Sequence, residues 1–151
     1  SGANEDVKTT SEYGWRKDPM SGARKFHHGL DIDGETGDTV RTTESGKVSK
    51  VTTDGDYGNM VEVDHGNGLK TRYAHLSKID VKVNDDIEKG QKIGEMGSTG
   101  KSTGSHLHYE VLQNGTRVEP RSFLPIDPVI AKNLFNKYLI VLPKQKRNIR
   151  C

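Results

Sequence analysis

Two histidines separated by one residue, His106 and His108, are the first candidates for chemistry in this chain of 151 residues. Side chains alternate between the two faces of a β-strand, so these imidazoles would lie on one face about 7 Å apart, with Leu107 pointing into the core. At that spacing one histidine can bind a metal ion while the other reaches a water molecule held by the ion. Taken alone the pair is a weak signal, because two histidines on a strand are also found as a surface pair.

A second candidate group lies in residues 27–31, His-His-Gly-Leu-Asp. Gly29 and the alternating apolar residues after it favour a loop that enters a strand, and glycine lets the backbone bend so that His27 and Asp31 converge. Two imidazoles and one carboxylate form a ligand set typical of catalytic zinc, with a fourth position left for water. His28 has a less suitable spacing and is expected to be exposed or to lie behind the ligands.

Two further histidines have plain structural interpretations. His75 lies in residues 73–76, Tyr-Ala-His-Leu, at the end of an expected strand, where a lone histidine is usually a structural residue. His65 lies within the turn formed by residues 64–68 and is given no role.

The elements that must position these residues are predicted to be short antiparallel strands. Seventeen glycines and five prolines indicate many tight turns, and apolar residues alternate along the segments between positions 30 and 124. Residues 60–64 and 69–73 flank Asn67-Gly68, which predicts a hairpin, and Asn114-Gly115 predicts another. This region has no segment with the length and 3.6-residue period of a long helix. The predicted fold is therefore mainly β, with an antiparallel sheet or sandwich-like core and short loops.

The two ends are expected to differ from this core. Residues 1–11 are interpreted as a flexible N-terminal segment or a remnant of cloning, and residues 12–125 as one folded domain. Residues 126–151 are predicted to form a C-terminal helix and a basic tail, because Asp127-Pro128 is a good helix start and apolar residues follow near helical spacing. Packing on the core is the preferred role of this helix, with contact to a partner or a membrane surface as the alternative.

Composition argues against some classes of function. The net charge is only +2, and the one dense basic run, residues 144–150, has no interleaved aromatic residues, so nucleic-acid binding is not expected. The single cysteine, Cys151, allows no internal disulfide. Neither a signal peptide nor a membrane-spanning stretch is recognised, which leaves open an address or an anchor in sequence that precedes this chain.

Three ordered blocks of the sequence resemble the signatures of the M23 metallopeptidases, the lysostaphin-like or LytM-type family. The blocks are residues 27–31, residues 73–76 and residues 97–110, the last of which ends in His-Leu-His-Tyr-Glu. The resemblance extends over about residues 12–124. Ser105 departs from it, because proline is frequent at that place in the family, and this puts the shape of the loop in doubt but none of the ligands.

The resemblance implies a LytM-type β core, one zinc ion per chain and a role for each of five residues. His27, Asp31 and His108 would be the zinc ligands. His106 and His75 would be the catalytic histidines, and which of them is the general base stays open. Composition adds a separate prediction, that residues 55–60 and 97–105, rich in glycine, serine and threonine, form a groove around the metal for an extended substrate.

The implied activity is zinc-dependent endopeptidase cleavage of the peptide cross-links of bacterial peptidoglycan, with its stem peptides as the partner. The residues of the three blocks are more similar to envelope proteins of Gram-negative bacteria, which favours a D,D-endopeptidase in the periplasm. A membrane anchor or a regulatory segment would then lie outside this chain. Glycine-bridge cleavage and a phage origin stay open.

Two other classes of function are weighed against this one. A catalytically silent LytM-type domain would bind or activate other cell-wall hydrolases and would carry no zinc, so metal analysis distinguishes it. Residues 83–94 resemble half of a biotinyl or lipoyl carrier module, but the sequence has no Met-Lys-Met, and a carrier would leave the histidines unexplained.

Overall fold

The computed structural model describes residues 8–11, 14–17, 24–27, 29–120 and 141–142, with side chains described for residues 29–120. Within these residues the secondary structure is strand and turn without an α-helix. The strands are β1 (Lys8–Ser11), β2 (Gly14–Lys17), β3 (Arg24–His27), β4 (Leu30–Asp33), β5 (Thr39–Arg41), β6 (Gly46–Thr52), β7 (Asn59–Gly66), β8 (Leu69–Ile79), β9 (Asp86–Ile87), β10 (Lys92–Met96), β11 (His106–Gln113), β12 (Thr116–Val118) and β13 (Val141–Leu142). The prediction of a mainly β, antiparallel fold is confirmed.

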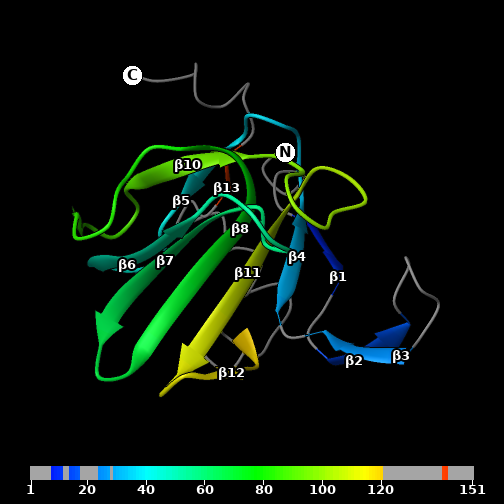
Figure 1. Cartoon of the computed structure of the whole chain (residues 1–151), viewed down its shortest axis with the longest axis horizontal. Helices are drawn as coiled ribbons and strands as arrows, with labels where there is room; N and C mark the ends of the chain where they lie inside the picture. Colours follow the sequence, from blue (N-terminus) through cyan, green and yellow to red (C-terminus); the bar gives the residue numbers. More distant parts are fainter. Residues whose placement is uncertain (1–7, 12–13, 18–23, 28, 121–140, 143–151) are drawn as a thin grey trace, which may run out of the picture.

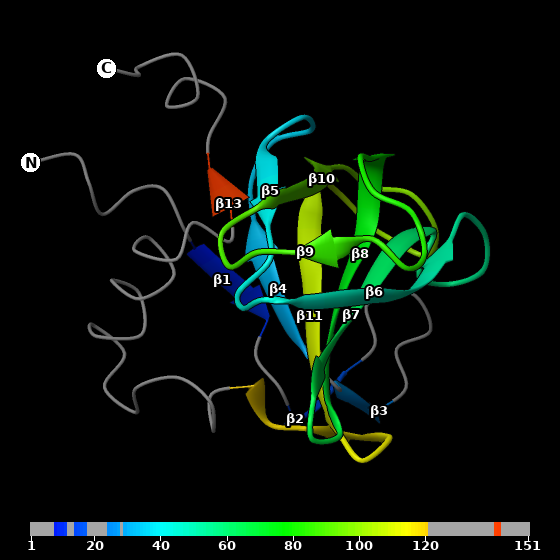
Figure 2. The ribbon, with the colours of Figure 1, turned by 90° about the vertical axis from the view of Figure 1, so that its left-hand side faces the viewer.

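Eleven of these strands form one antiparallel sheet, in which β11 lies between β4 and β8 (Figure 1). The long strand β8 has three neighbours, because its first part pairs with β11 and β7, and its last part pairs with β10. The sheet is strongly curved, since β6 runs across the direction of β11 when the molecule is turned (Figure 2). β2 and β3 form a separate two-stranded sheet.

The two hairpins predicted from Asn-Gly pairs are present. β7 and β8 are joined through Asn67-Gly68, and β11 and β12 through Asn114-Gly115. All four turn residues have positive φ, between 52° and 82°. Asparagine and glycine tolerate this left-handed conformation, and the resulting turn twists in the same sense as the strands that it connects.

The core lies on one face of the strands that carry the site residues. Leu30 and Ile32 of β4 and Leu107 and Tyr109 of β11 are all buried and belong to the main apolar cluster. Burial of a large apolar side chain stabilises a protein by about 1.5–3 kcal/mol, so this packing fixes which face of each strand points inward. The alternate residues of both strands must therefore lie on the opposite face.

The segments predicted to flank the domain contribute two strands to the same sheet. Lys8–Ser11, within the segment interpreted as flexible, forms β1 and pairs with β4. Val141–Leu142 forms β13 and pairs with β5, and the rest of the predicted C-terminal helix lies outside the described residues. The described part of the chain has no helix with both the length and the apolar character that crossing a bilayer requires.

Candidate active site

Pairing of β4 with β11 brings the first two predicted site residues together. Asp31 is directly opposite His108 in the register of these strands, 77 positions away in sequence. Because Leu30 and Leu107 turn into the core, both polar side chains lie on the other face of the sheet. The Oδ1 atom of Asp31 lies 2.8 Å from Nδ1 of His108, close enough for both atoms to approach one metal ion.

His75 reaches the same place from a break in the regular geometry of β8. Ala74 pairs with His108 on β11, whereas Leu76 pairs with Met96 on β10, so His75 lies where β8 changes partner. Its φ angle is 62°, which is uncommon for a residue other than glycine, and its backbone N–H donates to the carbonyl of Tyr57 at 2.9 Å. Conformations of this kind persist where the surrounding structure holds them, and they are frequent at functional sites.

Four of the five predicted site residues therefore lie together. The ring centroid of His75 is 5.0 Å from that of His106 and 5.9 Å from that of His108. The Nε2 atom of His106 is 3.6 Å from Oδ1 of Asp31. His106 and His108 share one face of β11, as their spacing predicted, while Leu107 between them is fully buried.

The fifth predicted site residue, His27, is placed only through its backbone. It ends β3 opposite Gly14, and its side chain lies outside the described residues, as does His28. Among the residues whose side chains are described, no group of three metal-ligating residues forms a metal site. The described donors are thus Asp31 and His108, and the role of His27 stays a prediction.

Backbone carbonyls fix the protonated nitrogen of both predicted catalytic histidines. Nδ1–H of His75 donates to the carbonyl of Thr99 at 2.6 Å, and Nδ1–H of His106 donates to the carbonyl of Gly104 at 2.9 Å. A carbonyl only accepts, so in a neutral ring the lone pair is on Nε2. Each histidine is therefore set up to accept a proton at Nε2.

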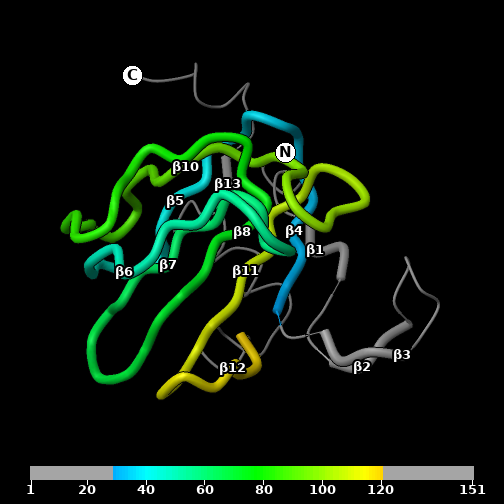
Figure 3. The backbone as a smooth tube through the Cα atoms, viewed as in Figure 1, coloured from blue at the N-terminus to red at the C-terminus, as the bar shows by residue number. Residues whose placement is uncertain are grey.

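The loop of residues 97–105 supplies both of these carbonyls. Hydrogen bonds and close packing hold it against the turn before β7. The loop connects β10 with β11 (Figure 3). The hydroxyl of Thr99 accepts from the backbone N–H of Asn59 at 3.0 Å and donates to the carbonyl of Leu76 at 2.7 Å. Gly58 packs so closely on Thr99 that a Cβ atom there would lie 2.4 Å from its carbonyl carbon. Segments 55–60 and 97–105, predicted to form a groove, are thus in contact, and the groove itself stays a prediction.

Burial and neighbouring charges move the pKa values of two of these histidines in opposite directions. Burial lowers the pKa of His75 to about 4, and the charges of His106 and His108 act in the same direction. His75 is therefore neutral at pH 7. Burial also lowers the pKa of His108, but hydrogen bonds with the carboxylates of Asp31 and Glu110 outweigh it and raise the pKa to about 9.

Sequence reasoning missed the residues behind His108. Glu110 is 2% exposed, and one of its carboxylate oxygens, Oε2, lies 2.8 Å from Nε2 of His108. The hydroxyl of Tyr57 donates to the other oxygen of this carboxylate, Oε1, and the guanidinium of Arg72 lies 3.5 Å from Oε1 as well. The period-two alternation that placed His106 and His108 on one face also includes Glu110, so a signal for this contact was present in the sequence.

The chemistry of the donors fits a zinc ion. An imidazole nitrogen and a carboxylate oxygen are both common zinc ligands, and here they face each other at 2.8 Å. A carboxylate hydrogen-bonded to the second nitrogen of a ligating histidine is a frequent companion of such sites, and Glu110 occupies that place.

Comparison with known proteins agrees with this fold. The family description Peptidase family M23 matches residues 25–120, so the chain belongs to this family. The chain is 41% identical over 119 residues to the peptidoglycan DD-endopeptidase ShyB of Vibrio cholerae, an alignment that covers 79% of this chain and 27% of that protein. The chain spans about a quarter of the length of the curated relatives that it matches first.

Two solved structures show the same fold. A zinc-containing peptidase from Vibrio cholerae is 39% identical with a TM-score of 0.71, over 76% of this chain and 36% of that one. The catalytic domain of the antimicrobial peptidase lysostaphin from Staphylococcus simulans is 33% identical, also with a TM-score of 0.71, over 80% of this chain and 93% of that one. The family predicted from the three sequence blocks is confirmed.

Proposed function

We propose that this chain is a zinc-dependent endopeptidase that hydrolyses peptide cross-links of bacterial peptidoglycan. The observation that carries the proposal is the convergence of Asp31, His108, His106 and His75 from three separate strands on one place. Membership of peptidase family M23 and similarity to a named peptidoglycan DD-endopeptidase supply the substrate class. The D,D-type of cross-link is the preferred bond for the same reason.

In this proposal His27, Asp31 and His108 would hold the zinc ion. When bound, zinc supplies Lewis acidity, which polarises a scissile carbonyl and makes water more acidic. The structure supports the second and third of these ligands through the contact between their donor atoms. Similarity to a structure described as a zinc-containing peptidase favours zinc over other divalent metals.

The two remaining histidines would handle protons. His106 Nε2 accepts a proton from the attacking water, and the carbonyl of Gly104 keeps its Nδ1–H in the required tautomer. His75, held neutral by burial, orients the water or stabilises the negative charge that develops on the substrate carbonyl. The low pKa of His75 means that its protonation would not limit the activity until the pH falls toward about 4.

The proposed place of action is the cell envelope, with the periplasm of a Gram-negative bacterium as the preferred compartment. The peptidoglycan relative comes from Vibrio cholerae, and it is much longer than this chain. We propose residues 12–125 as the peptidase domain, and further segments of a longer protein would supply any anchor or regulation.

Digestion of purified peptidoglycan tests the proposal. The chain, loaded with zinc, should release muropeptides whose masses identify the broken cross-link, and His106→Ala should release none above the buffer control. Thermal unfolding and zinc content of His106→Ala serve as controls, because a fold or metal defect would also remove activity. Identical muropeptides from both proteins and from buffer would reject the endopeptidase.

The same experiment decides the alternative of a catalytically silent domain that binds or activates other hydrolases. That alternative is not favoured, because the five positions where the family places ligands and catalytic residues all hold histidine or aspartate. A silent domain would bind peptidoglycan without changing its mass pattern and would contain no zinc.

A further inference from the structure

A buried carboxylate lies directly behind His108, on the side away from Asp31. Glu110 follows His108 by two positions on β11, so both side chains lie on the same face of the sheet. One ring nitrogen of His108, Nδ1, faces Asp31 at 2.8 Å, and the other, Nε2, faces Oε2 of Glu110 at 2.8 Å. The imidazole is thus held at both ends by carboxylates from different strands.

The chemistry of this contact decides which nitrogen of His108 can bind a metal. An ionised carboxylate only accepts hydrogen bonds, so the contact with Glu110 requires the proton to be on Nε2. The carboxylate of Asp31 likewise accepts from Nδ1. A metal ion bound beside Asp31 would take the place of the proton on Nδ1, while Glu110 keeps the proton on Nε2. Glu110 also limits rotation of the ring about its bond to the backbone, because the contact is short and the side chain is buried.

Other residues hold Glu110 in place rather than compete for it. The hydroxyl of Tyr57 donates to Oε1 at 2.9 Å, with Oε2 at 3.1 Å. Arg72 lies between two carboxylates, but its short contact is with Glu62, at 2.7 Å from Nε, whereas its distance to Glu110 is 3.5 Å. The shortest contact of the Glu110 carboxylate is therefore with His108, and Arg72 has a closer partner in Glu62.

We propose that Glu110 is a positioning residue for metal binding, which holds the tautomer and the orientation of His108 so that Nδ1 faces the ion. This rests on the proposed zinc site. Tyr57 acts one step further out, by orienting the carboxylate of Glu110. Loss of a carboxylate behind a ligating histidine typically weakens metal affinity by about 10- to 100-fold, which sets the expected size of the effect.

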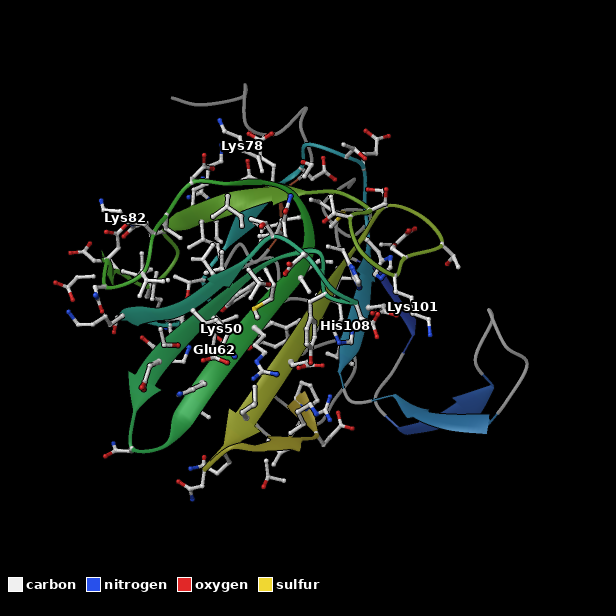
Figure 4. The ribbon with its side chains drawn as sticks, viewed as in Figure 1. Lys50, Glu62, Lys78, Lys82, Lys101 and His108 are labelled. Atoms are coloured by element: carbon white, nitrogen blue, oxygen red, sulfur yellow. The ribbon has the colours of Figure 1, made fainter. Side chains whose placement is uncertain are left out.

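A second buried glutamate beside Arg72, Glu62, offers a matched control for Glu110. Glu62 on β7 and Glu110 on β11 both pair with Arg72 on β8, and both are buried. Figure 4 labels Glu62 and His108. Glu62 has hydrogen bonds with Arg72 and Ser49 and none with His108 among the described contacts. Replacing either glutamate with glutamine removes one buried negative charge beside Arg72, but only one replacement alters the contact with His108.

The experiment measures the zinc dissociation constant of the unmodified chain, Glu110→Gln and Glu62→Gln, by competition with a chromogenic chelator at pH 7.5. We expect a 10- to 100-fold weaker affinity for Glu110→Gln and an unchanged affinity for Glu62→Gln. The visible absorption spectrum of the cobalt(II)-loaded proteins should change for Glu110→Gln alone, because it reports the geometry of the ligands. Equal zinc affinities in the two variants would overturn the inference.

A second variant and two further outcomes keep this inference distinct from the proposed function. If Glu110→Gln did not fold, Glu110→Asp would decide, because it keeps the charge beside Arg72 but is one methylene shorter; zinc affinity equal to that of the unmodified chain would reject the positioning role. If the unmodified chain bound no zinc, the proposed function and the inference would both be wrong. If it bound zinc and cleaved peptidoglycan while Glu110→Gln bound zinc equally well, only the inference would be wrong.

Discussion

The close approach of Gly58 to the loop that holds His75 gives a sharp prediction about activity. A Cβ atom at position 58 would lie 2.4 Å from the carbonyl carbon of Thr99 and 2.5 Å from the nitrogen of Gly100. Carbon atoms in ordinary contact are about 3.5–4.0 Å apart, so Gly58→Ala must displace this backbone by about 1 Å. The same peptide carries the carbonyl that accepts from Nδ1–H of His75.

Gly55 supplies the control, because it lies in the same turn and differs in one respect. Both glycines have positive φ, 61° for Gly58 and 78° for Gly55, so alanine at either position loses about 1–2 kcal/mol of stability from backbone strain. A Cβ atom at Gly55 meets nothing within 4 Å. Crowding at Gly58 adds about 1–3 kcal/mol of its own.

The expected kinetic result is a kcat about 100-fold lower for Gly58→Ala, because a displacement of about 1 Å near a reacting group can cost that much. Gly55→Ala should keep the kcat of the unmodified chain. Initial rates on purified peptidoglycan measure both, at a temperature where thermal unfolding shows both variants folded. If folded Gly58→Ala kept the kcat of Gly55→Ala, the placement of Thr99 would not control His75, and the reasoning would be refuted.

Three further predictions concern the site and the charges behind it. His75→Asn should lower kcat by about 10²- to 10⁴-fold with an unchanged zinc content, since asparagine tolerates the positive φ; an unaltered kcat would remove His75 from the mechanism. Burial raises the pKa of Glu62, but hydrogen bonds from Arg72 and Ser49 outweigh burial and lower the pKa overall. The ionised Glu62 therefore stabilises the folded state above the unfolded pKa of about 4.3, and this contribution is lost as the pH falls below that value. Urea unfolding should therefore show the stability advantage over Glu62→Gln shrinking between pH 7 and pH 3.5, and a constant difference would contradict the lowered pKa. A strong chelator should abolish peptidoglycan cleavage and lower the melting temperature, with both restored by zinc, because a bound metal stabilises the folded state; a melting temperature that ignores the chelator would argue against a metal in the fold.

Much of the architecture follows from local patterns in the sequence. The alternation around Leu107 predicts that His106 and His108 share a face, because side chains on a strand repeat every two residues. The Asn67-Gly68 pair predicts its hairpin, because few residues tolerate the required positive φ. Three ordered blocks were enough to predict the family, and the match over residues 25–120 confirms it.

The tertiary structure decided what no local pattern contains. Asp31 and His108 meet through the register of β4 against β11, which depends on packing between segments 77 positions apart. His75, interpreted from its strand end as structural, reaches the site because β8 changes partner there and adopts a positive φ. The short contact of Glu110 with His108 likewise requires a buried, desolvated face of the sheet, since the same two residues on an exposed strand would be separated by water. Sequence thus set which side chains share a face of each strand, and long-range packing set which strands, and so which side chains, became neighbours.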